Sequence, residues 1–206
     1  MRPYTDKTMS YDSDKHQRRS IRLKDYDYSQ AGAYFVTLCT RNKECIFGKV
    51  VNGEMVLNKC GKVVEEEWVK TAEIRKNVEL DVFVVMPNHF HGIAAIIEDC
   101  RGTARCAPTE HNRQFGKMTS ASLPAIIRSF KSAVTRQINE LRDTPYAPVW
   151  QRNYYEHVIR NEKDLNEIKE YIVSNPLKWD LDNENPNNVG ATCRSPQGEG
   201  TSPLRK

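Results

Sequence analysis

The sequence lacks the features that assign a chain to a class at first sight. No apolar run in its 206 residues approaches the roughly 20 residues that span a bilayer, and the N-terminal stretch is polar where a secretory signal is apolar. The six cysteines form no C-x-x-C pair and no cluster with the spacing of a zinc ribbon or zinc finger. No internal repeat is visible. We therefore expect a cytoplasmic protein with no membrane partner, whose cysteines are free thiols.

The chain also has few histidines and a small net charge. The chain has five histidines, and its 31 basic and 27 acidic residues leave a formal charge of +4. Charge of this size permits a polyanionic partner without requiring one. Basic residues do gather near the N-terminus, at Arg18, Arg19, Arg22 and Lys24, where they are either solvated or in contact with DNA.

The length suits one domain between two tails. Residues 1–30 are charged and aperiodic, and residues 181–206 are rich in Asn, Pro, Gly and Ser, so neither end can bury much apolar surface. We expect a flexible basic N-terminal arm over 1–30, a single domain over 31–180 and a flexible tail over 181–206.

Strand and helix patterns alternate between these tails. Short β-branched and aromatic runs predict strands, Asn52-Gly53 predicts a two-residue hairpin turn, and apolar residues at helical spacing predict three helices. This order is typical of an α+β, ferredoxin-like antiparallel sheet with helices packed mainly on one face, plus a small accessory hairpin and flexible termini. The strands are predicted over 33–40, 46–51, 54–57, 80–86, 92–97 and 154–159, and the helices over 60–76, 122–142 and 161–175.

Two of the few histidines stand one residue apart in the apolar stretch FVVMPNHFHGI. In an extended chain His89 and His91 project to the same side, which suits two-point metal ligation. On this tripeptide alone, a pair of histidines hydrogen-bonded at a turn remains the alternative. A binuclear metallohydrolase would have an acidic residue and another histidine directly after the pair, and a nucleotidyl-transfer triad would have a third histidine at position 93. Gly92 and Ile93 supply neither, so both classes are disfavoured.

The stretch LNEIKEYIVSNPLKW places a phenol and an amide about one helical turn apart. Tyr171 and Asn175 are separated by four residues, on neighbouring faces of a helix whose apolar stripe is Leu165, Ile168 and Ile172. The two side chains could enter one site together. A tyrosine at the rim of the core and an asparagine ending a helix before proline are the alternatives.

Longer motifs favour a functional site over a structural role for these four residues. VVMPNHFHGI, VWQRNYYEHVIRNEKDLNEIKEYIVSNPLKW and RRSIRLKDYDYSQAGAYFVTLCT together resemble the REP-associated tyrosine transposases, a branch of the single-tyrosine HUH (IS200-like) transposases, over roughly residues 18–180. The resemblance implies that His89, His91 and Asn175 are metal ligands and that Tyr171 is the nucleophile. It also implies a Mg²⁺ or Mn²⁺ cofactor, a hairpin or single-stranded DNA partner, and a monomer or homodimer associated with the bacterial nucleoid when bound.

The implied activity is that of a DNA transposase, a metal-dependent single-strand endonuclease and strand transferase acting near REP-like hairpins through a 5′-phosphotyrosine. Two imidazoles and an amide favour Mn²⁺ over Mg²⁺ on ligand grounds, and we retain both metals. A catalytically inactive, regulatory hairpin-binding protein of the same fold is one alternative. An unrelated metalloenzyme acting on small molecules is another.

Basic residues interleaved with aromatics are what single-stranded DNA requires, because phosphates need neutralising and bases need stacking surfaces. Tyr154 and Tyr155 are rival nucleophiles without a ligand one turn away, and packing or base stacking suits them better. The roles of Glu156 and His157 stay open. The predicted DNA-binding residues are Arg18, Arg19, Arg22, Arg128, Lys131, Arg152 and Lys178.

Overall fold

The computed structural model describes residues 23, 26–97 and 122–188. The predicted elements are present, most with ends shifted by one or two residues. The strands are β1 (Gly32–Cys39), β2 (Gly48–Val51), β3 (Glu54–Leu57), β4 (Val78–Val85), β5 (His89–Ile96) and β6 (Tyr155–Ile159), and the helices are α1 (Lys59–Ile74), α2 (Leu123–Arg142) and α3 (Glu162–Ser174), with short 3₁₀ helices η1 (Arg41–Lys43) and η2 (Pro176–Leu181).

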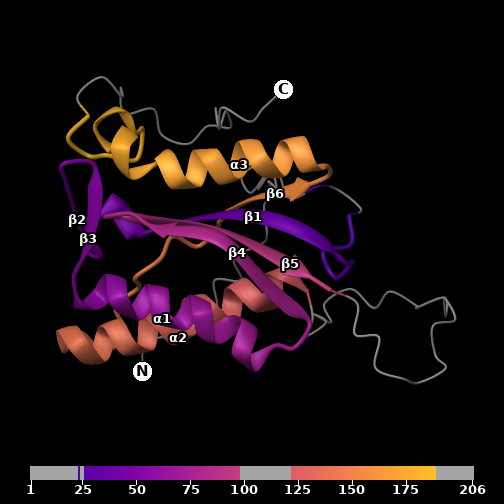
Figure 1. Cartoon of the computed structure of the whole chain (residues 1–206). Coiled ribbons are helices and arrows are strands. Elements are labelled where there is room, and N and C mark those ends of the chain that lie inside the picture. The colour runs from indigo at the N-terminus through magenta and orange to yellow at the C-terminus, as the bar shows by residue number, and fades with distance from the viewer. Residues whose placement is uncertain (1–22, 24–25, 98–121, 189–206) are drawn as a thin grey trace, which may run out of the picture.

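Four strands form one antiparallel sheet in the order β4-β5-β1-β6. Leaving out the β2-β3 hairpin, the chain runs β1-α1-β4-β5-α2-β6, which is the connectivity of a ferredoxin-like sheet, and α3 follows it. The predicted fold class is therefore confirmed. Figure 1 shows α1 and α2 on one face of the sheet and α3 alone on the other.

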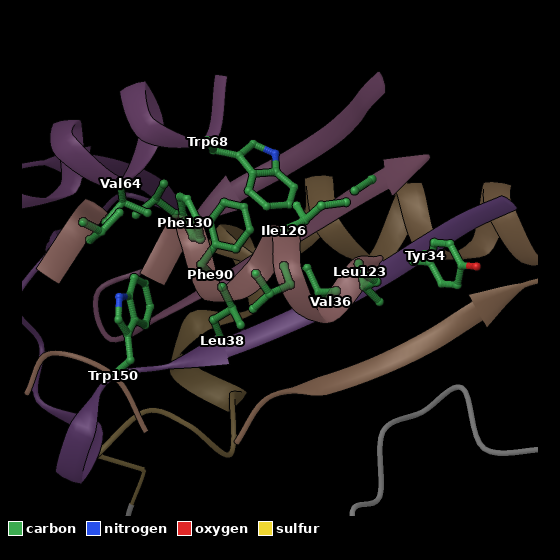
Figure 2. Close-up of a cluster of buried hydrophobic side chains, with 14 of the residues drawn as sticks. Tyr34, Val36, Leu38, Val64, Trp68, Phe90, Leu123, Ile126, Phe130 and Trp150 are labelled. Atoms are coloured by element: carbon green, nitrogen blue, oxygen red, sulfur yellow. The ribbon is translucent and has the colours of Figure 1, made fainter. Parts of the chain in front are cut away.

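The face toward α1 and α2 carries the larger core. Trp68 of α1, Phe90 of β5 and Phe130 of α2 pack within 4.7–5.5 Å of one another, measured between ring centroids, at the centre of Figure 2. Trp68 lies four residues after the buried Val64, the spacing that predicted an amphipathic helix. This core fixes β5 from one side only, and the opposite side of the strand carries the histidines.

The face toward α3 has a smaller apolar cluster of its own. Phe35 of β1 and Ile93 of β5 pack against Ile168 and Ile172 of α3, and all four side chains are buried. Ile168 and Ile172 lie four residues apart, so they hold one stripe of the helix on the sheet. Their burial sets the rotation of α3 and therefore the direction of Tyr171, one residue before Ile172.

The accessory hairpin forms at the predicted turn. Asn52 and Gly53 both have positive φ, at 52° and 78°, as a two-residue turn between β2 and β3 requires. A larger residue would also clash at this position, because a Cβ on Gly53 would lie 2.6 Å from the Leu177 side chain of η2.

Both predicted tails are shorter than expected where they meet the domain. Tyr28, placed by prediction in the flexible arm, is buried against Tyr34. In the predicted tail, Asn185 is buried and donates to the Trp179 carbonyl at 3.0 Å, and Asn188 donates to the Asp182 carbonyl at 3.2 Å. Side-chain amides thus satisfy backbone groups in a segment with little apolar surface. Residues 1–22, 24–25 and 189–206 lie outside the described residues.

None of the helices in the described ranges has the length and apolar character needed to cross a membrane.

Candidate active site

The two motif histidines lie at the start of β5. This strand begins at His89, three residues before the predicted start, because His89 pairs with Cys39 and His91 with Thr37 of β1. Both side chains are buried on the α3 face, with ring centroids 4.6 Å apart. The strand alternation that predicted their shared side is confirmed.

The C-terminal end of α3 brings the phenol and the amide to the same place. Tyr171 is half-buried, and its hydroxyl lies 3.4 Å from His91 Nε2. Asn175 caps the helix, which ends one residue earlier than predicted, and its side chain is 97% buried, being 3% exposed. The structure therefore places Tyr171 and Asn175 over the histidines, about eighty residues away in sequence.

Hydrogen bonds occupy the Nδ1 atom of each motif histidine. His91 Nδ1 lies 2.8 Å from Thr37 Oγ1, and His89 Nδ1 lies 2.9 Å from Asn88 Oδ1. Phe35 stacks on the His91 ring with centroids 5.6 Å apart. Partners on Nδ1 leave Nε2 of each ring available as a ligand, an arrangement common around metal-bound histidines.

Two buried acceptor atoms in this site have no hydrogen-bond partner among the described residues. They are His89 Nε2 and Asn175 Oδ1. Buried polar atoms are ordinarily satisfied, so this pair, beside a third nitrogen on His91, forms a donor set that could hold a cation. In the described part of the chain no three His, Cys, Asp or Glu side chains are grouped closely enough to hold a metal, so the donor set depends on the Asn175 amide.

Asp182 is a site residue that the sequence reasoning missed. Its Oδ2 atom lies 3.8 Å from His89 Nε2, and its Oδ1 atom accepts the Glu184 backbone N–H at 2.7 Å. A carboxylate oxygen facing an unprotonated imidazole nitrogen is repulsive unless a cation lies between them. The signal available in the sequence was the Asp- and Asn-rich run after Trp179, which is typical of side-chain-capped turns rather than of a tail.

Burial sets the protonation of the site. It lowers the pKa of His89 to about 4 and that of His91 well below its ordinary value, so both imidazoles are neutral and able to ligate at neutral pH. Burial raises the pKa of Tyr171 to about 12, and the Asp182 carboxylate acts in the same direction. The phenol is therefore protonated at neutral pH, and it would need a base in order to act as a nucleophile.

The predicted DNA-binding residues are dispersed. Arg128 is exposed on α2, across the sheet from Tyr171, whereas Lys178 is exposed in η2 beside Trp179, whose ring lies 5.9 Å from that of His89. Lys131 donates to the carbonyls of Gln151 and Arg152, which uses its ammonium within the protein. Arg18, Arg19 and Arg22 lie outside the described residues.

A cavity of about 780 Å³ lies between α2 and residues 145–152. Its lining includes Arg136, Arg152 and Tyr146, which is 98% exposed, together with the acidic Glu140 and Asp143. Its lining does not include His89, His91, Tyr171, Asn175 or Asp182, so the cavity is separate from the histidine site.

Tyr154, Tyr155 and His157, whose roles the sequence left open, make packing contacts. His157 Nε2 lies 2.9 Å from Asp164 Oδ2, a contact between β6 and α3. Tyr155 packs edge-on to Phe35, with centroids 6.3 Å apart, and Tyr154 borders the larger core. These contacts agree with the packing role expected for the two tyrosines.

Comparison with known proteins places the chain in a family by sequence. No protein-family model matches the chain. A Haemophilus influenzae protein described as an uncharacterized protein is 44% identical over 179 residues, which cover 85% of this chain and 97% of the relative. The chain belongs to the same family as this Haemophilus protein.

Two solved structures are similar to the chain at lower identity. A REP-associated tyrosine transposase bound to a REP hairpin is 22% identical, with a TM-score of 0.47, over 76% of this chain and 73% of that one. A provisionally named transposase from Deinococcus radiodurans R1 is 14% identical, with a TM-score of 0.38, over 74% and 95%. Both are described as transposases, the class that the sequence motifs resemble. Similarities of this extent leave the function to be argued from the chain's own residues.

Proposed function

We propose that the protein is a DNA transposase of the single-tyrosine type, which nicks and rejoins single-stranded DNA near hairpins. One observation supports this most strongly: the Tyr171 hydroxyl lies 3.4 Å from a buried imidazole nitrogen, beside a second imidazole and a buried amide oxygen with unsatisfied lone pairs. A candidate nucleophile adjoining a set of metal donors fits phosphoryl transfer better than a structural role.

The residues present fit a divalent cation. His89 Nε2, His91 Nε2 and Asn175 Oδ1 would hold it, with the Asp182 carboxylate close by to balance its charge. When bound, such a cation supplies Lewis acidity, which orients and polarises the scissile phosphate. Two imidazoles and an amide oxygen favour Mn²⁺ on ligand grounds, and the resemblance to single-tyrosine transposases implies Mg²⁺ or Mn²⁺, so we retain both metals.

Tyr171 carries the covalent step in this proposal. Its hydroxyl gives up its proton as the oxygen attacks phosphorus and forms a tyrosine phosphodiester with the 5′ side of the break. The bond to the 3′ oxygen breaks, and that oxygen takes up one proton to become a hydroxyl, so protons balance over the step. A 3′-hydroxyl can later attack the phosphotyrosine and restore both groups. No nucleotide cofactor is needed, because the intermediate conserves the phosphodiester.

DNA would approach from the exposed end of the site. Lys178 lies beside Trp179 in η2 and is the described basic residue nearest in sequence to Asn175 among those predicted to contact DNA. Arg152 and Arg136, with the exposed ring of Tyr146, offer phosphate and stacking contacts farther away. We propose Lys178 as a contact close to the cleaved strand and Arg128 and Arg152 as contacts to a flanking duplex.

Incubation with end-labelled hairpin DNA and Mn²⁺ or Mg²⁺ tests this function. We expect a denaturation-resistant adduct with the unaltered protein and none with Tyr171→Phe, while Tyr155→Phe, a matched change in a neighbouring tyrosine, leaves the adduct intact. Tight hairpin binding without an adduct under either metal would favour the inactive regulatory protein instead. Absence of any gel shift would favour an enzyme acting on small molecules.

A further inference from the structure

Asn88 contacts His89 through a side chain whose orientation the structure fixes. It is 1% exposed, and its Nδ2 atom lies 3.1 Å from the Lys43 carbonyl and 2.6 Å from the Glu184 carbonyl. The backbone carbonyl of Asn88 accepts the Thr40 backbone N–H at 2.8 Å, so the backbone of Asn88 is held as well. Because a carbonyl oxygen only accepts, both neighbours require the amide NH₂ group of Asn88 to face them.

This orientation determines where the proton of His89 lies. With Nδ2 facing the two carbonyls, Asn88 Oδ1 faces His89 Nδ1 at 2.9 Å, and an amide oxygen can only accept. His89 Nδ1 therefore carries the hydrogen. In the neutral imidazole only one nitrogen carries a hydrogen, so Nε2 is left with a lone pair, and Nε2 is the atom directed at the candidate metal site.

The opposite tautomer has a competing partner. Asp182 Oδ2 lies 3.8 Å from His89 Nε2, and a hydrogen on Nε2 would turn this repulsive contact into a hydrogen bond after a small movement. In that form His89 could not ligate a metal. Asn175 also interacts with the His89 side chain. The ring therefore lies between Asn88 on Nδ1 and further acceptors, Asp182 first among them, and the balance between them decides which nitrogen carries the hydrogen.

We propose that Asn88 is a positioning residue that holds His89 in the Nδ1–H tautomer against the pull of Asp182, so that Nε2 is presented as a ready ligand. The Glu184 carbonyl on the same amide links this control to the segment that carries Asp182. The consequence for metal affinity rests on the proposed function, whereas the tautomer itself does not.

Nitrogen NMR of the full-length, metal-free protein labelled with ¹⁵N-histidine tests the proposal. His89 signals are identified by their loss in His89→Gln. We expect Nδ1 to be protonated in the unaltered protein, and Nε2 to become predominantly protonated in Asn88→Ala. Asn88→Asp keeps an acceptor toward His89, so its Nδ1–H form should persist. Asn185→Ala removes a buried hydrogen bond in the same segment without touching His89, and should leave the tautomer unchanged.

Metal titration adds a second readout. Loss of a hydrogen-bond partner behind a ligating histidine typically weakens metal binding about 10- to 100-fold, and we expect a loss of this size for Mn²⁺ in Asn88→Ala but not in Asn185→Ala. An Nε2–H ring in the unaltered protein, or an unchanged tautomer in Asn88→Ala, would overturn the proposal. The predicted tautomers without any Mn²⁺ binding would leave the positioning intact and count against the proposed function. If Asn88→Ala does not fold, the unaltered protein and Asn88→Asp still decide the tautomer.

Discussion

Acidification of the metal-free protein should expose the energetic cost of burying two neutral histidines. The pKa of His89 is about 4 in the folded chain and about 6.5 in an unfolded one. Between these values the unfolded state binds one more proton at this residue than the folded state does. Stability therefore falls as the pH drops below about 6.5 and levels off near pH 4.

The size of this effect follows from proton linkage. One proton of difference corresponds to about 1.4 kcal/mol for each pH unit, so His89 alone should remove about 2 kcal/mol of unfolding free energy between pH 7 and pH 5. His91, whose pKa is also lowered by burial, contributes with the same sign. Such a loss is a substantial part of the 5–15 kcal/mol stability typical of a domain, and it lies above the range where most carboxylates titrate.

Urea unfolding in the presence of a chelator, at half-unit steps from pH 7 to pH 5, measures the effect. His89→Gln removes the titrating group but keeps a polar side chain, so the difference between the two proteins isolates His89. We expect the variant to lose about 2 kcal/mol less than the unaltered protein over this range. Equal losses, or a stability that rises on acidification, would refute the buried neutral imidazole.

Four further substitutions test other parts of the structure. Asp182→Asn should weaken Mn²⁺ binding by at least about tenfold in a calorimetric titration, since it removes the charge beside the donors, and unchanged affinity would separate Asp182 from the site. Lys131→Met should lower the urea midpoint, because two backbone carbonyls lose their donor. Arg128→Ala should leave the midpoint unchanged and weaken hairpin binding. A stable Lys131→Met protein, or an Arg128→Ala protein that is destabilised but binds hairpins normally, would contradict these roles. Gly92→Ala should cost about 1–3 kcal/mol in the same unfolding assay, because a Cβ there would lie 2.7 Å from the Phe90 ring, and a neutral result would show that the ring can move.

Local patterns account for what the sequence predicted well. Alternation placed His89 and His91 on one face, Asn52-Gly53 set the hairpin, and the stripe of Ile168 and Ile172 oriented α3. Each of these features depends on residues within a few positions of one another, so the regular geometry of a strand, turn or helix is enough to predict it.

Contacts between distant segments account for what the sequence did not predict. Asn88 reaches the Glu184 carbonyl across 96 residues, and Asp182 reaches His89 from a segment with almost no apolar periodicity. Polar turn residues were interpreted as a flexible tail because composition reports how much a segment can bury, and not which carbonyls its amides will satisfy. The helices were also expected mainly on one face, and the structure shows that α3, alone on the other, is the one that carries Tyr171.

The most direct test of the proposed function is to identify the residue that becomes linked to DNA. The adduct formed with hairpin DNA and Mn²⁺ would be digested and its nucleotide-bearing peptide sequenced by mass spectrometry. A 5′-phosphate attached to Tyr171, together with a free 3′-hydroxyl on the released strand, is the predicted result. Attachment at another residue, or cleavage that leaves no protein-linked strand, would contradict the account.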